Sequence, residues 1–116
     1  MTVTDPLIQV SLLGEAIENG PLAVFVADEN ERYIAASRAA CELLGYTREE
    51  LLGLSVTDVA RYEEAAEEYS ELLATGSGAG TTVLTCKDGS TVEFTYFAGE
   101  TEVAGMQVYI SVGAPT

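Results

Sequence analysis

The stretch that decides the fold is Leu43-Leu44-Gly45-Tyr46-Thr47-Arg48-Glu49-Glu50-Leu51-Leu52-Gly53. Gly45 ends an apolar run and is a typical C-terminal cap of a helix. Thr47 and Glu50 have the spacing of a capping box, in which each side chain accepts a hydrogen bond from the other residue's backbone N–H. Gly53 can end the short helix that begins there. The stretch therefore predicts a helix ending at Gly45, a turn, and a second short helix.

Upstream of this stretch the sequence predicts a β-hairpin. Residues 23–27 are a short apolar run, and the polar residues 28–31 separate them from the extended segment 32–36. Ser37 can then cap the helix that ends at Gly45.

Residues 6–18 predict an N-terminal amphipathic helix, assigned to residues 1–20 as a separate segment. Pro6 near its start and Asn19-Gly20-Pro21 at its end are typical helix boundaries. The helix is apolar over much of its surface, so it needs a partner. The partner is either the sheet of its own domain or another subunit.

Residues 61–75 predict a longer helix with one apolar and one acidic face. Three strands follow, at 81–86, 91–97 and 103–112. Asp88-Gly89 predicts a tight hairpin between the first two, and a second turn is expected near Gly99. Both faces of these strands are partly apolar, so both should be covered, and the N-terminal helix is a candidate cover for the second face.

Two strands, then helices, then three antiparallel strands predict an α+β domain. The helices would lie on one face of a five-stranded antiparallel sheet, with the N-terminal helix at its flank. The length of 116 residues fits one such domain. We assign it to residues 21–113 and expect residues 114–116 to form a C-terminal tail.

Composition excludes several classes of function. Nineteen acidic residues against five basic ones give a net charge of −14, which repels nucleic acids and anionic lipids. Histidine is absent, so no Ser-His-Asp triad and no histidine-held metal is possible. We expect no enzyme activity, no metal site, no nucleic-acid partner and no membrane association. With no signal peptide in the sequence, we expect a cytoplasmic protein with reduced cysteines.

The sequence resembles a PAS domain, a small sensor module of signalling proteins, over residues 21–113. The resemblance is carried by residues 26–28, 32–37 and 39–53, and more weakly by the hairpin at 87–90. Ser37 stands where the family often has Asn, but Ser also caps helices. The exit from the last strand lacks the Asp-Ile-Thr-like sequence that often leads to an effector domain.

This resemblance implies a pocket between the central helices and the inner face of the sheet. The residues that it places there as ligand-binding candidates are Phe25, Ala27, Val59, Tyr62, Phe94, Tyr96, Tyr109 and Ser111. Core filling without a ligand is an equally good interpretation of the same side chains.

The resemblance leaves the cofactor unknown. Haem held by histidine is excluded, whereas ligation by Cys86, Met106 or a tyrosine stays open and is not favoured. In flavin photoreceptors of the family a reactive cysteine follows the second short helix. That position falls at Val56 here, so thiol-adduct photochemistry is not expected.

Two functional hypotheses follow. In the first, the domain is a sensory or regulatory module that binds a small, mostly neutral molecule, or responds through altered packing, and signals to a partner. In the second, it is a ligand-free interaction module that forms a homodimer. The dimer would use the apolar face of the N-terminal helix at Leu7, Ile8, Leu12 and Leu13.

Overall fold

The computed structural model describes residues 2–60 and 77–116. The helix expected over residues 61–75, including the candidate site residue Tyr62, lies outside the described residues.

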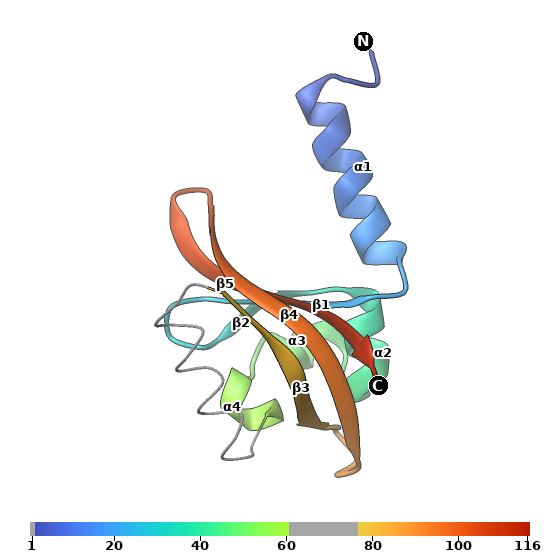
Figure 1. Ribbon diagram of the computed structural model, residues 1–116, viewed down its shortest axis with the longest axis vertical. Coiled ribbons are helices and arrows are strands. Elements are labelled where there is room, and N and C mark those ends of the chain that lie inside the picture. Colours follow the sequence, from blue (N-terminus) through green and yellow to red (C-terminus); the bar gives the residue numbers. More distant parts are fainter. Residues whose placement is uncertain (1, 61–76) are drawn as a thin grey trace.

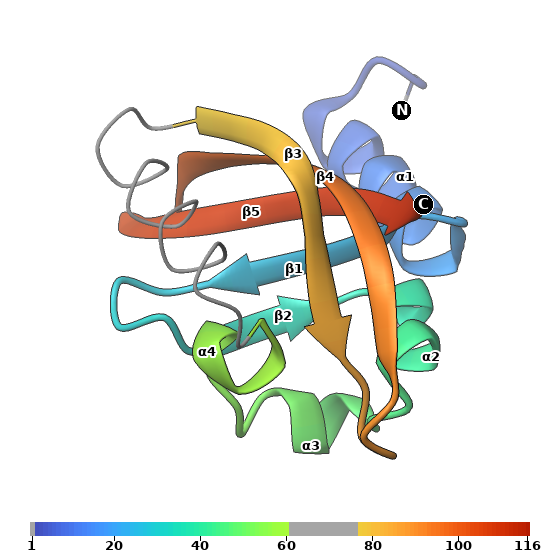
Figure 2. The ribbon, with the colours of Figure 1, turned by 60° about the horizontal axis from the view of Figure 1, so that its bottom comes forward.

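A five-stranded antiparallel sheet forms the centre of the molecule (Figures 1 and 2). Its strands are β1 (Ala23–Ala27), β2 (Tyr33–Ala36), β3 (Ser77–Thr85), β4 (Thr91–Val103) and β5 (Met106–Pro115). Their spatial order is β2-β1-β5-β4-β3, so the first and last strands of the domain pair at the middle of the sheet. The expected α+β class and the antiparallel sheet are confirmed.

Four described helices accompany the sheet: α1 (Pro6–Asn19), α2 (Arg38–Leu44), α3 (Arg48–Leu51) and α4 (Val56–Val59). Figure 1 shows α2, α3 and α4 on one side of the sheet. The core lies between these helices and the inner sheet face. The largest fully buried side chains in this core are Phe94, Leu44, Leu51 and Val59.

The deciding stretch folds as its sequence predicts. Gly45 adopts a left-handed φ of 79° and ends α2, and the N–H of Glu50 donates to Oγ1 of Thr47 at 3.1 Å. The N–H of Thr47 donates in return to Oε1 of Glu50 at 3.0 Å. A second capping box, at Ser55 and Asp58, begins α4. The short helices therefore owe their ends to local side-chain bonds.

β4 is longer than expected, whereas β5 has the expected length but begins and ends three residues later. The predicted turn near Gly99 is wrong, because β4 continues to Val103 and the chain reverses at Ala104 and Gly105, which have φ values of 50° and 79°. Two successive positive φ values suit the twist of a tight hairpin. The expected tail is also revised, since Ala114 pairs with Thr95 inside the sheet.

The N-terminal helix does not cover the second sheet face, contrary to our expectation. α1 extends away from the domain (Figure 1), and none of its residues is buried. Leu7 is 77% exposed, and Phe97 on the second sheet face is 73% exposed. Only the last turns of α1 approach the sheet, at Val24 and Val112. A three-residue link joins the helix to β1.

Candidate functional site

An apolar cavity of about 110 Å³ lies over the inner face of the sheet. The described residues that line it are Phe25, Ala27, Tyr33, Val56, Ala60, Gly78, Thr82, Leu84, Phe94, Tyr96, Tyr109, Ile110 and Ser111. They come from all five strands and from α4 with its C-terminal cap. The pocket therefore lies between the sheet layer and the helical layer.

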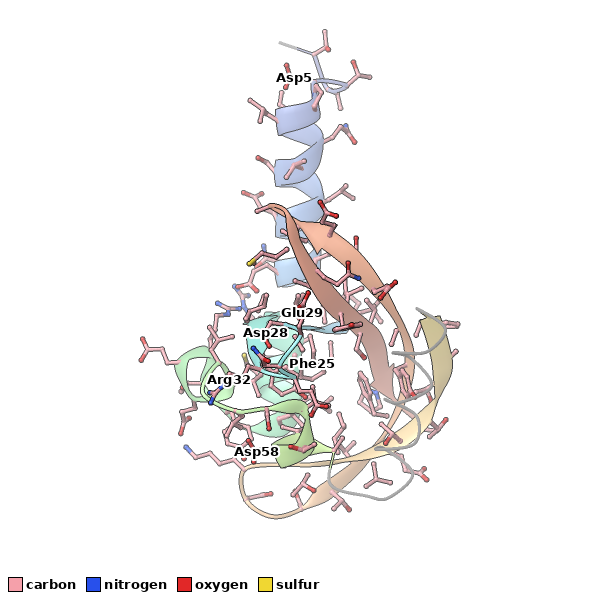
Figure 3. All side chains as sticks on the ribbon, turned by 90° about the vertical axis from the view of Figure 1, so that its left-hand side faces the viewer. Asp5, Phe25, Asp28, Glu29, Arg32 and Asp58 are labelled. Carbon is pink, nitrogen blue, oxygen red and sulfur yellow. The ribbon has the colours of Figure 1, made fainter. Side chains whose placement is uncertain are left out.

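Strand register brings the central lining residues together. Phe25 pairs with Ser111 and Ala27 pairs with Tyr109, so these four side chains share one face of β1 and β5. On the neighbouring hairpin, Thr82 pairs with Phe94 on that same face. Figure 3 shows Phe25 in the space between the sheet and the helices.

Aromatic contacts fix the floor of the pocket. The Phe25 and Phe94 rings meet edge to face with centroids 6.0 Å apart, and the Phe25 and Tyr33 centroids are 5.5 Å apart. Such geometries are favourable for aromatic pairs. Phe25 thus joins β1, β2 and β4 in one packed unit.

The described pocket wall carries no charged side chain. Its polar side chains are hydroxyls, from the tyrosines at 33, 96 and 109, from Thr82 and from Ser111. A carboxylate or ammonium ligand would be desolvated there without an opposite charge from these residues. The volume resembles that of an apolar cavity of about 150 Å³ that takes up benzene. The described wall suits a small, neutral, largely apolar molecule.

A family model for the PAS domain matches residues 21–109. The chain belongs to the PAS domain family. No curated protein sequence matches the chain. PAS domains are in general sensory modules of signalling proteins rather than enzymes, so the chain is a module of sensory type.

Solved PAS domains share the fold at low sequence identity. The domain is similar to a PAS domain from a two-component sensor histidine kinase, with a TM-score of 0.83, 16% identity, and coverage of 97% of this chain and 100% of that chain. It is also similar to the PAS domain of an HTR-like protein from Haloarcula marismortui. That TM-score is 0.81 at 20% identity, with 93% and 97% of the two chains covered.

A third similar structure is a domain of a sensory box sensor histidine kinase/response regulator from Geobacter sulfurreducens. It has a TM-score of 0.80 and 16% identity, and the match covers 97% of this chain and 99% of that chain. These likenesses agree with the PAS fold built above from strand register and helix caps.

Six of the eight candidate site residues line the pocket of this PAS domain. They are Phe25, Ala27, Phe94, Tyr96, Tyr109 and Ser111. Val59 is not in the wall: it is fully buried and packs in the core with Leu51. On the single turn of α4, Val56 and the cap residue Ala60 face the pocket instead. Binding of a ligand by any of these residues stays a prediction.

The sequence reasoning missed several lining residues. Tyr33 lies in the wall because a register irregularity between Val26 and Ala27 places it opposite Ala27. No local sequence pattern predicts such an irregularity. Thr82 and Leu84 could have been found, since an Asp-Gly hairpin between the strands sets which residues of β3 face the same side as Phe94.

Neither cysteine lines the pocket of this PAS domain. The Cys86 thiol donates to the carbonyl of Leu43 at 3.5 Å, and burial raises the pKa of the Cys41 thiol. Val56 is in the pocket wall. It stands at the position where the family's flavin photoreceptors have their reactive cysteine. The described wall thus offers no thiol for adduct chemistry.

Within residues 2–60 and 77–116, no three His, Cys, Asp or Glu side chains gather closely enough to hold a metal ion. In the same part of the chain, no helix has the length and apolar character needed to cross a membrane.

Proposed function

We propose that this PAS domain is a sensory module whose pocket binds a small, neutral, largely apolar molecule carrying a hydrogen-bonding group. The observation that carries the proposal is a cavity walled by aromatic and aliphatic side chains, with hydroxyls as the polar groups of its described wall. A few placed polar groups in an apolar pocket are typical of small-molecule sites.

The proposed mechanism is a shift between two arrangements of the layers. Tyr109 belongs to the sheet and Val56 to the helical layer, and both line the same cavity. A ligand in contact with both prefers one spacing of the layers and raises the population of that arrangement. A partner that touches the helices or the sheet then meets a different surface.

A pocket-filling variant tests this proposal. Ala27→Leu places a larger side chain at a buried position of the wall, whereas Ala35→Leu on β2 does so at an exposed position. Native mass spectrometry of the purified protein, and thermal shifts with a library of neutral aromatic compounds, would measure binding. We expect binding to wild type and Ala35→Leu, and loss in Ala27→Leu.

Two results would contradict ligand binding. One is a wild-type protein that carries no added mass and gives no thermal shift with any compound. The other is a compound that binds Ala27→Leu as well as it binds wild type, since it would then occupy another place.

A second candidate function is homodimerisation through α1. Val10, Leu13 and Ile17 form an exposed apolar stripe along the helix, at a spacing that places them on one face. Leu7 and Leu12, which the sequence analysis named for the dimer, are exposed as well, while Ile8 is half-buried. A second copy could cover this stripe and remove apolar surface from water.

Light scattering of Val10→Lys and Ser11→Lys tests the dimer. The two variants add the same charge at adjacent exposed positions, but only Val10 belongs to the stripe. We expect a dimer for wild type and Ser11→Lys and a monomer for Val10→Lys. A wild-type monomer at millimolar concentration would argue against this function.

A further inference from the structure

Glu18, in the last turn of α1, is held by hydrogen bonds from two elements of the PAS domain, α2 and α3. The Arg48 guanidinium of α3 donates to both Glu18 carboxylate oxygens, at 2.6 and 2.8 Å. The backbone N–H of Arg38, at the start of α2, donates to Oε1 of Glu18 at 3.1 Å. Nε of Arg48 also donates to the carbonyl of Ala36, at the end of β2. A single carboxylate thus joins α1 to α2 and α3, and through Arg48 to β2.

Apolar packing leaves the direction of α1 weakly determined. None of its residues is buried, and an apolar cavity of about 200 Å³ lies between its last turns and the sheet, lined in part by Leu13, Ile17 and Val112. An unfilled space of this size gives the helix room to tilt, because its lining atoms lack partners on one side. Glu18 supplies the directional contacts that packing does not.

The link after α1 also favours a pivot at this point. A Cβ on Gly20 would lie 2.5 Å from the carbonyl oxygen of Ala16, so only glycine allows the chain to leave the helix so closely. Pro21 follows and continues the link to β1. The turn is therefore compact, and a small change there alters the direction of the whole 14-residue helix.

We propose that the Glu18–Arg48 pair is an ionic latch that sets the angle of α1 on the PAS domain and frees the helix when it opens. The Arg48 side chain is 46% exposed and that of Glu18 38%, and exposed ion pairs are weak enough to break and re-form. The latch is anchored next to the pocket, since Ala36 pairs with Phe25. The latch does not require a bound ligand, so its test is independent of the test of the proposed function.

Backbone ¹⁵N relaxation of the full chain tests the latch. Glu18→Gln keeps the shape of the side chain and removes its charge, and Glu15→Gln removes the same charge one turn earlier on α1. We expect order parameters near about 0.85 along α1 in wild type and Glu15→Gln, and below about 0.6 in Glu18→Gln. The amides of the sheet should keep their values in all three proteins, which reports that the domain is folded.

Salt provides a second measurement that needs no substitution. Raising the ionic strength to about 1 M shortens the screening length to about 3 Å and weakens an exposed pair. We expect α1 of wild type to become as mobile as in Glu18→Gln, with no further change in that variant. The proposal is overturned if α1 keeps its order in Glu18→Gln and in salt, or if Glu15→Gln loosens it equally.

Discussion

Single polar residues join the sheet to the helices of this domain. Ser37 is the buried polar residue of the described chain, and its hydroxyl accepts from the Val24 N–H at 3.0 Å and donates to the Leu22 carbonyl at 3.1 Å. It also caps α2 by accepting from the Ala40 N–H at 3.4 Å. One hydroxyl therefore positions the first strand against the first helix of the core.

Replacing Ser37 should cost far more than replacing an exposed serine. Ser37→Ala leaves the buried Val24 N–H without its acceptor and removes a helix cap. We expect the free energy of unfolding to fall by about 2–4 kcal/mol from the lost buried bonds and the lost cap together. Urea denaturation would measure it, with Ser11→Ala on α1 as a control that should change stability little.

Gly113 is required because a side chain there would meet both the backbone of β4 and the Phe94 ring. A Cβ at this position would lie 2.8 Å from the Phe94 ring and would also meet the Thr95 carbonyl oxygen. Gly113→Ala should destabilise the fold by about 1–3 kcal/mol, the usual cost of overfilling a core. The control is Gly78→Ala, where a Cβ meets no atom within 4 Å. Equal unfolding midpoints for the two variants would contradict this reading of the sheet.

At the scale of elements, α3 connects parts of the domain that are distant in sequence. Its Arg48 reaches α1, and its Glu50 pairs with Lys87 at 2.5 Å in the hairpin between β3 and β4. The Lys87 N–H also donates to the carbonyl of Leu44. Four residues of helix therefore carry both salt bridges of the described chain.

The Glu50 contacts make stability depend on pH in the acid range. The Lys87 ammonium, with the Thr47 backbone N–H, lowers the Glu50 pKa to about 2 from 4.5. Because the folded pKa is below the unfolded one, this contribution is present above pH 4.5 and is lost as the pH falls toward 2. We expect Glu50→Gln to be less stable than wild type at pH 6.

An acid titration tests whether the charge of Glu50 causes this difference in stability. The stability difference between wild type and Glu50→Gln should shrink as the pH falls through the range from 4.5 to about 2, as measured by thermal unfolding at each pH. Glu49→Gln, which changes a carboxylate of the same helix, is the control. A difference that stays constant down to pH 2 would show that the charge of Glu50 is not the cause.

The whole molecule carries a net charge of −14, which bears on the proposed dimer. Two such chains repel each other, and salt screens that repulsion as the Debye length falls from about 30 Å at 0.01 M to about 8 Å at 0.15 M. If α1 forms the interface, the dimer dissociation constant should fall as salt rises over this range. Analytical ultracentrifugation at the two concentrations measures it, and dissociation by salt would contradict an interface of apolar side chains.

Local features of the sequence predicted the helix caps and the α+β class, and with the PAS resemblance they predicted much of the pocket wall. The boundaries at Ser37, Gly45 and Thr47 depend on bonds between residues at most four apart, so their residue types predict them. Alternation predicted which residues of each strand share a face, and the PAS resemblance placed Phe25, Phe94 and Tyr109 on the inner face. The PAS resemblance also implied a pocket between the helices and the inner sheet face, whereas the spatial order of the strands was not predicted.

Only the tertiary structure decided two features: which side chains strand register and helix packing bring into the pocket, and how α1 is directed by contacts with distant segments. Tyr33 enters the pocket through an irregularity in strand pairing, and Val59 leaves it because α4 turns that side chain into the core. The direction of α1 follows from its contact with Arg48, thirty residues away from Glu18. The physical reason is that a periodic pattern fixes which face of an element is apolar, whereas the partner of that face is chosen only when the elements pack together.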